Sequence, residues 1–480
     1  MLFSLTKTQQ NVAKSGVFFI YLALILTTLS LTIASAAAYS QGVLSFERAI
    51  TLAQQYDPWL KGNKHQQNAL LALSRAVETL PDPKVSFAIV NLPTKGFDFS
   101  QEAMTQFKVG LGQTFPRGDT LAIKNQQLTF QSEAYPFERQ DRQAKIVVTV
   151  GSLWLDAYRI QQSLILIEKN RALFEQLADI TQASYSSALG KTRQQDIVRA
   201  QLELTRLDVQ LDQLAQQKSH YEGQLVPWLS RYLIDNNTDD QAEAFTLHDI
   251  SLGDSLGDSL VDINLQQSAL IFTPEWQKPE QLVTYFTQHP AVMAIDKKIK
   301  ATQTGVSLAQ QKYKPQWGVN ASYGYRDDDP SGHSRADFMS VAVTFDLPIF
   351  TENRQDQEVK SAIAQTEASK TEKVLLLRQL FGAYASGKGR LLRINDRLVL
   401  YRSKLLPQTH DQAEASLTAY TNDDGDFSEV VRAKIAVLNA EIEQLAIEVE
   451  QQKIILELNY LFAGTLPTSN NQRTAHGVSK

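Results

Sequence analysis

Three prolines recur at one constant spacing, and this recurrence constrains the fold more than any other feature of the chain. The paired prolines lie 232 residues apart: Pro58 with Pro290, Pro83 with Pro315, and Pro116 with Pro348. Self-similarity at a fixed period indicates a duplicated structural unit. The sequence therefore predicts two tandem copies, at about 44–229 and 278–464, joined by a connector at 230–277 that is rich in Ser, Asp and Gly. A flexible C-terminal tail is expected at 465–480.

Each copy begins with an amphipathic pattern that predicts one helix, at 46–80 in the first copy and at 279–312 in the second. A proline follows each pattern, and proline cannot continue the hydrogen-bond ladder of a helix. Two segments of alternating apolar and polar residues come next, and this period of two predicts strands with one apolar face. The predicted strands are 84–91, 105–115, 316–326 and 337–347.

These strands allow two interpretations. Alternation over about ten residues is typical of a transmembrane barrel, and aromatic residues near the strand ends resemble the girdles of such barrels. The aromatic residues concerned are Phe115, Trp317, Tyr325 and Phe345. A soluble hairpin that packs on the helices would show the same alternation. Four strands cannot close a barrel, so a barrel requires an oligomer in which a dimer supplies eight strands and a trimer twelve.

Long helical patterns follow the second strand of each copy, at about 120–188 and 352–418, and return helices are predicted at about 192–226 and 427–462. A helix of about 65 residues reaches about 100 Å, which a compact globule does not need. Leucines at steps of three and four, such as Leu204, Leu207 and Leu211, form a seam of the kind that packs coiled coils. An ordinary helical bundle would use the same seam.

The N-terminal segment predicts export. Lys7 and Lys14 precede an apolar run from Val17 to Ala34, and small residues follow it. This is the layout of a signal peptide, predicted at 1–38. An uncleaved membrane anchor is the alternative, because the run is close to the roughly 18 residues that suggest a spanning helix.

The composition argues against several other functions. A net charge of −5 leaves no basic footprint for nucleic acid. Cysteine is absent, which excludes disulfides, thiolate metal sites, a cysteine nucleophile and lipidation through cysteine. The seven histidines show no metal-binding spacing, and the tandem Gly-Asp-Ser-Leu at 253–260 lacks the strand context of a serine hydrolase. We therefore predict a protein without catalytic activity, metal site or cofactor.

The layout as a whole resembles the outer-membrane efflux proteins typified by TolC, over about 44–464. The segment LPDPKVSFAIVNLPTKGFDFSQEAMTQFKVGLGQTFPRGDTL, residues 80–121, is similar more narrowly to the outer-membrane subunits of RND-type heavy-metal cation efflux systems. The resemblance implies an α+β membrane protein that forms a homotrimer in the outer membrane and extends into the periplasm. The four strands of each chain would contribute to a twelve-stranded β-barrel, and long coiled-coil hairpins would form an α-barrel. Its implied partners are outer-membrane lipid, a periplasmic adaptor and an inner-membrane RND-type pump.

The resemblance also implies roles for the tips of the two helical hairpins. Gly190, Lys191, Thr192 and Arg193 at one tip, with Gly425 at the other, would dock the adaptor, although Lys191 is an extra residue relative to the family's Gly-Thr-Arg tip. Acidic residues near the tips would line the periplasmic entrance and attract cations, with Arg199 or Arg432 joining gating networks. These acids are Asp196, Asp423, Asp424, Asp426 and Glu429. Ordinary turn chemistry explains Asp423, Asp424 and Asp426 equally well.

Two questions stay open at this point. A periplasmic coiled-coil scaffold whose strands never enter lipid is the alternative to a channel. The cargo of a channel is also undecided, because metal ions and drugs leave through similar conduits while the pump and the adaptor choose the substrate.

Overall fold

A computed structural model describes residues 44–186, 193–229, 279–422 and 425–464. The predicted signal peptide, the connector, the C-terminal tail and the Gly-Asp-Ser-Leu repeat lie outside these residues. The chain divides into two compact units. Of the described residues, the first unit holds 44–56, the part of 153–229 that is described, and the described part of 413–438. The second unit holds 57–152, 279–412 and 439–464.

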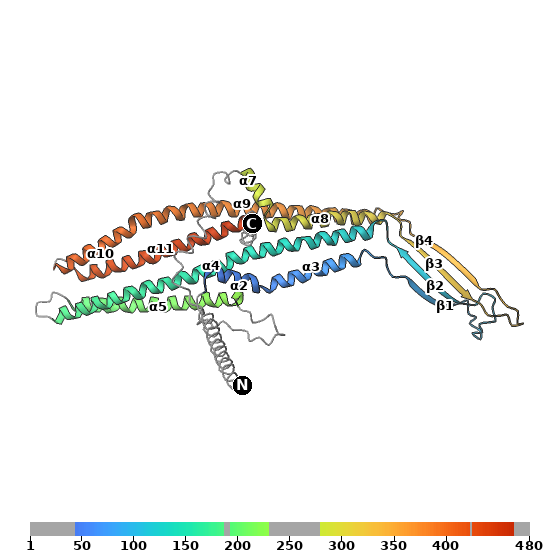
Figure 1. The fold of residues 1–480 in the computed structure, drawn as a ribbon, viewed down its shortest axis with the longest axis horizontal. Helices are drawn as coiled ribbons and strands as arrows, with labels where there is room; N and C mark the ends of the chain where they lie inside the picture. Colours follow the sequence, from blue (N-terminus) through green and yellow to red (C-terminus); the bar gives the residue numbers. More distant parts are fainter. Residues whose placement is uncertain (1–43, 187–192, 230–278, 423–424, 465–480) are drawn as a thin grey trace, which may run out of the picture. The chain divides into compact units, whose positions relative to one another are not determined.

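A four-stranded antiparallel sheet belongs to the second unit (Figure 1). Its strands are β1 (Lys84–Val90), β2 (Gln106–Phe115), β3 (Trp317–Tyr325) and β4 (Phe338–Phe345), and they pair in the order β1-β2-β3-β4. Each strand lies within two residues of its predicted bounds. The two hairpins come from different halves of the chain, and β2 and β3 join them along nine registered pairs from Phe107 with Tyr325 to Phe115 with Trp317.

The register gathers the apolar side chains on one face of the sheet. Val85, Leu111 and Val341 share one row across the sheet, with Ala321 between the last two. Small polar positions share the opposite face, where Ser86, Gly110, Ser322 and Ser340 form a row. We define the apolar sheet face by its most exposed residues: Val85, Phe87, Ile89, Leu111, Tyr323, Met339, Val341 and Val343, which are 52–78% exposed. A soluble hairpin that packs on the helices would bury this face, so the exposure disfavours that interpretation.

The first helices are each broken, and the predicted single helices at 46–80 and 279–312 are wrong in this respect. The first copy has α2 (Phe46–Tyr56) and α3 (Pro58–Ala76), and the second has α7 (Pro279–Thr287) and α8 (Pro290–Gln310), followed by the short 3₁₀ helix η3 (Gln311–Tyr313). Pro58 and Pro290 cause the breaks, because a proline lacks the N–H that a preceding helix requires but suits the first position of a new one. The residue before each proline caps the new helix: Asp57 accepts from the N–H of Trp59, and His289 from that of Ala291.

The two long helices differ from each other. The first is α4 (Thr120–Ser186), a single helix of 67 residues that contains Pro136. The second is predicted as one helix at 352–418, but the structure divides it into α9 (Gln355–Leu400), a π-helical segment η4 (Tyr401–Leu405) and α10 (Leu406–Thr421). Pro407 follows the π segment, and its missing N–H and its ring disturb the preceding turn. The return helices are α5 (Gln194–Leu229) and α11 (Phe427–Leu461). None of the described helices has the length and apolarity to cross a membrane.

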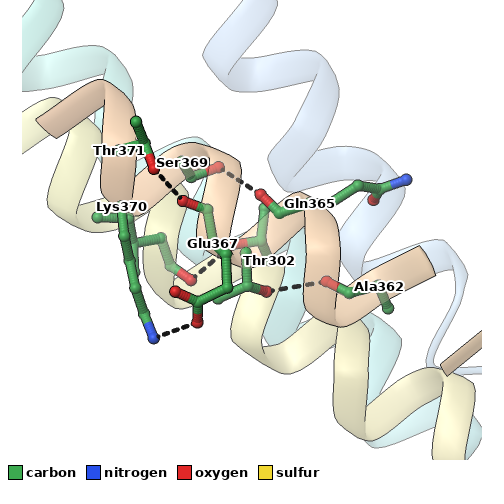
Figure 2. A network of polar contacts seen from close by, with 9 residues as sticks. Thr302, Ala362, Gln365, Glu367, Ser369, Lys370 and Thr371 are labelled. Carbon is green, nitrogen blue, oxygen red and sulfur yellow. Dashed lines mark hydrogen bonds and ion pairs between the residues drawn. The ribbon is translucent and has the colours of Figure 1, made fainter. Parts of the chain in front are cut away.

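The core of the second unit lies among α7, α8, α9 and α11. Its largest fully buried side chains are Phe286, Leu391, Ile447 and Phe462. An ion pair connects α8 and α9: the Nζ of Lys373 lies 2.7 Å from the Oδ1 of Asp296. Hydroxyl groups of α9 bond back to carbonyls of their own helix, as Figure 2 shows for Thr371 and Ser369. Such bonds satisfy hydroxyl groups without requiring a partner on a neighbouring helix.

The first unit is held by a buried tryptophan and by a helical seam. Trp154 is fully buried, donates from Nε1 to the carbonyl of Leu44 at 2.9 Å, and packs edge-on against Phe46. On α4, Ile160, Ile167 and Phe174 are buried at the seven-residue spacing of a coiled coil. The seam predicted for α5 is partly buried as well: Leu207 is buried, and Leu204 and Leu211 are half-buried.

His289 is a buried titratable group in the second unit. It is fully buried beneath Tyr460, with the two ring centroids 4.9 Å apart. Its Nδ1 accepts the N–H of Ala291 at 3.2 Å, so the ring proton sits on Nε2, which lies 3.1 Å from the carbonyl oxygen of Tyr460. Burial lowers the pKa of His289 below its ordinary value, and the nearby Lys145 lowers it further, while Asp141 and the bond to Tyr460 oppose these effects. The arrangement therefore requires a neutral ring.

We predict that the stability of the protein falls below about pH 6.5 partly because of His289. The unfolded chain takes up a proton on this histidine at a higher pH than the folded chain does, so stability is complete above the unfolded pKa and is lost as the pH falls toward the folded pKa. His289→Asn keeps a capping acceptor and removes the titration. Thermal unfolding at pH 7.5 and pH 5 should show a smaller loss in the variant than in the wild type. Equal losses would contradict the prediction.

Candidate functional site

The predicted tip residues belong to the first unit, and half of them lie outside the described part of the chain. Gly190, Lys191, Thr192, Asp423 and Asp424 are in this group. Arg193, Asp196, Gly425, Asp426 and Glu429 are described, and they stand at the starts of α5 and α11.

Asp196 caps the start of α5. Its Oδ2 accepts the backbone N–H of Arg193 at 2.9 Å, and the residue is only 7% exposed. Arg193 stands just before the first residue of the helix and Asp196 is the third residue within it, so the contact is the backward half of a capping box. The family resemblance implies an entrance role for Asp196, which stays a prediction; the structure shows that its carboxylate also holds the start of α5.

Asp426 caps the start of α11 in a different way. Its Oδ1 accepts the N–H of Ser428 at 3.1 Å. This hydrogen bond lowers the pKa of Asp426, and the charges of Arg193 and Arg199 on the other hairpin lower it further. The structure thus brings the start of α5 and the start of α11 within electrostatic reach of one another. The preceding Gly425 is needed for space, because an added Cβ would lie 2.7 Å from the backbone nitrogen of Tyr420.

Glu429 is the open carboxylate of this group. It lies in the first turn of α11 and is exposed, whereas its neighbours Phe427 and Ser428 are buried. None of the ion pairs among the described residues involves Glu429. Of the described acids predicted at the entrance, Asp196 is buried, Asp426 is exposed but accepts the N–H of Ser428, and Glu429 is exposed.

A second polar centre lies where the sheet meets the helices of the second unit. We define this sheet–helix junction as residues 116–120, 311–316 and 346–355. Arg117 donates from Nη1 to the carbonyl of Lys314 at 2.8 Å and pairs through Nη2 with Asp346. The same aspartate accepts the N–H of Gln316 at 2.7 Å. One arginine therefore connects all three segments of the junction.

The turn after β2 is shaped to allow this contact. Gly118 has a φ of 43°, which lies in the left-handed region that favours glycine. Next to it, Asp119 pairs with Lys314 at 3.1 Å. Pro116 and Pro348 stand out in the sequence as repeat markers, whereas no sequence pattern predicts a role for Arg117. The turn-forming Pro-Arg-Gly-Asp at 116–119, directly after a strand, was the available signal, while the partner at Asp346 is 229 residues away from Arg117.

Comparison with known proteins identifies the fold. No protein-family model and no curated protein matches the sequence. Solved structures match at probability 1.00. The outer membrane channel CmeC of Campylobacter jejuni has a TM-score of 0.64 and 13% identity, over 89% of this chain and 88% of that chain. The outer membrane protein VceC of Vibrio cholerae has a TM-score of 0.65 and 13% identity, over 87% and 96%.

A third match is the open state of the outer membrane channel MtrE of Neisseria gonorrhoeae, with a TM-score of 0.64 and 12% identity, over 87% of this chain and 88% of that chain. The chain has the fold of TolC-like outer-membrane channels. The matches cover nearly the full length on both sides, so the sheet and the long helical hairpins both belong to the shared fold. The low identity means that function must be argued from the residues of this chain.

Proposed function

We propose that this protein is the outer-membrane channel of a tripartite efflux system. It would receive substrates from an inner-membrane pump through a periplasmic adaptor and release them outside the cell. The observation that carries the proposal is the apolar sheet face, where eight large apolar side chains lie on the same side of one sheet and are each 52–78% exposed. An exposed apolar surface of this extent needs a non-aqueous partner, and lipid is the partner that suits a sheet with one apolar and one small polar face.

The open edges of the sheet support a homotrimer. Among the described strands, β1 pairs only with β2 and β4 only with β3, so each outer edge has backbone groups without a ladder partner. Lipid cannot satisfy such groups, and pairing β4 of one chain with β1 of the next would. Three chains supply twelve strands, which encloses a lumen, whereas two chains supply eight, which leaves room only for side chains. The row that contains Ser86, Gly110 and Ser322 would then face water.

The hairpin ends support an entrance on the periplasmic side. Glu429 and Asp426 present carboxylates at the start of α11, and Arg193 and Arg199 lie near Asp426. Three copies around an axis would concentrate negative charge, which attracts cations. The adaptor would dock on the adjoining tips, including Gly190, Lys191 and Thr192. The similarity of residues 80–121 to heavy-metal efflux subunits supports metal cations as the cargo.

Fractionation and conductance test the proposal. The protein should co-sediment with the outer membrane and run as a detergent-stable trimer, and the purified trimer should produce discrete conductance steps in planar bilayers. Release by osmotic shock together with the absence of a membrane-inserted trimer would overturn it in favour of a periplasmic scaffold. A membrane-inserted trimer without conductance steps would correspond to a closed channel, and its insertion would still distinguish the protein from a periplasmic scaffold.

We predict that Glu429→Gln lowers the cation preference of the channel, because three negative charges leave the entrance. Reversal potentials in a salt gradient measure this preference. Glu47→Gln is the matched control, because Glu47 is also an exposed acid in the first turn of its helix, α2, and lies outside both tips. The substitution at Glu47 should leave the reversal potential unchanged. An equal effect of the two substitutions would show that Glu429 has no special place in the conduction path.

A further inference from the structure

The sheet–helix junction contains a cavity of about 340 Å³ with a strongly positive lining. Arg117, Lys124, Lys312 and Arg354 all line it, and none of its lining residues is acidic. Two of these cations have carboxylate partners: Arg117 pairs with Asp346, and Lys312 pairs with Glu358 at 2.7 Å. Among the described residues, no carboxylate forms an ion pair with Lys124 or Arg354. The cavity therefore carries two uncompensated positive charges.

A buried side chain in the same cavity has an unused hydrogen-bond acceptor. Gln355 lines the cavity and is only 8% exposed, yet its Oε1 has no hydrogen-bond partner among the described residues. A buried carbonyl oxygen without a donor is costly, so such groups are nearly always satisfied by protein, water or ligand. Gln355 begins α9 and Thr120 begins α4, and Thr120 also lines the cavity. The starts of both helices add a favourable field for an anion.

Exposed apolar side chains lie in the segment that leads from the sheet to the cavity residue Arg354. Leu347, Ile349 and Phe350 follow β4 and precede Arg354, and they are 63%, 68% and 91% exposed. At the adjoining end of the sheet, the rings of Trp317 and Phe345 lie 5.0 Å apart and are also exposed. A free inorganic anion would use only the cations. A ligand with an anionic group, a hydrogen-bond donor and an apolar tail would use all three features of the junction.

We propose that this cavity binds the headgroup of a glycerophospholipid whose headgroup carries a hydrogen-bond donor, such as phosphatidylethanolamine. The phosphate would contact Lys124 and Arg354, the headgroup ammonium would donate to Oε1 of Gln355, and the acyl chains would lie along Leu347, Ile349 and Phe350. The proposal rests on the proposed function, because only a sheet in the membrane brings lipid to the junction. The bound lipid would fix the depth of the sheet in the bilayer.

Titration of the purified, detergent-extracted protein with the soluble lipid dihexanoyl-phosphatidylethanolamine tests the proposal, with thermal stabilisation as the readout. Dihexanoyl-phosphatidylcholine and inorganic phosphate are the comparison ligands, since choline has no N–H to donate and phosphate has no tail. We expect the ethanolamine lipid to bind most tightly. Lys124→Gln combined with Arg354→Gln should weaken its binding by about tenfold or more, because two charge-assisted hydrogen bonds are lost.

Two further variants make the test specific. Lys169→Gln combined with Arg378→Gln removes one exposed cation from each of the same two helices, away from the cavity, and should leave binding unchanged. Gln355→Met removes the acceptor and should abolish the preference for ethanolamine over choline without preventing binding. Equal effects of the two double variants, or equal stabilisation by phosphate and lipid, would overturn the lipid assignment. Membrane fractionation and conductance of the same preparations report on the channel independently.

Discussion

Phe87→Lys is expected to prevent stable insertion of the protein into the outer membrane, whereas Ser86→Lys on the same strand is expected to permit it. The two residues are adjacent in β1 and point to opposite faces of the sheet, and Phe87 is 70% exposed on the apolar one. A lysine at the lipid face of a barrel costs about 2–4 kcal/mol near the middle of the bilayer. A homotrimer would carry this cost three times. Density-gradient fractionation and the yield of heat-modifiable oligomer measure the outcome.

A second pair of lysine variants, on the edge strand β4, tests membrane insertion at a site independent of β1. Val341→Lys and Ser340→Lys in β4 repeat the comparison, since Val341 shares the apolar face and Ser340 the small polar one. Lysine at the polar positions meets water in the proposed lumen and should be tolerated. If all four variants inserted equally well, or if all four stayed soluble and folded, the apolar face would not contact lipid and the periplasmic scaffold would become the better interpretation.

The strands and long helices could be predicted because their signals are local. Period-two alternation in segments such as Val85 to Ile89 depends only on neighbouring residues, and it placed all four strands within two residues. The broken first helices were also predictable in principle. Asp57-Pro58 and His289-Pro290 each combine a capping side chain with a proline at the first helical position, which is a start signal rather than a tolerated interruption.

Residue type alone does not report how exposed the predicted entrance acids are. Asp196 is the third residue of α5, where it accepts the N–H of Arg193 and is buried. Glu429 is an equally acidic residue in the first turn of its own helix and remains exposed. The difference between the two depends on which residues surround each helix start, and sequence position does not report this.

The junction could not be predicted, because it depends on contacts between distant segments. Arg117 meets Asp346 only after β2 and β3 have paired and brought the two halves of the chain into one sheet. The cavity beside Arg117 likewise combines residues from both halves, including Lys124 and Arg354. Neither residue stands out in a sequence in which charged side chains make up 21% of the total.

Trp154→Ala is expected to lower the free energy of unfolding by about 3–5 kcal/mol, the range for truncating a fully buried aromatic side chain. Trp154 is 0% exposed, stacks on Tyr158 with the ring centroids 5.5 Å apart, and donates to the carbonyl of Leu44. Trp154→Phe keeps most of the packing and loses the hydrogen bond, so we expect a smaller loss of about 1–3 kcal/mol. Denaturant unfolding in detergent, followed by circular dichroism, measures both.

Trp59 provides the control for this prediction, because it is 41% exposed and its main specific contact is the guanidinium of Arg142, 5.8 Å from the ring centroid. A cation–π contact at an exposed site contributes about 0.5–1 kcal/mol, so Trp59→Ala should cost far less than Trp154→Ala. A similar cost for both would mean that Trp154 does not anchor the N-terminal segment to α4. A much larger loss of stability for Trp154→Ala than for Trp59→Ala would instead support the conclusion that Trp154, through its contacts with Leu44 and Phe46, holds the N-terminal segment against α4.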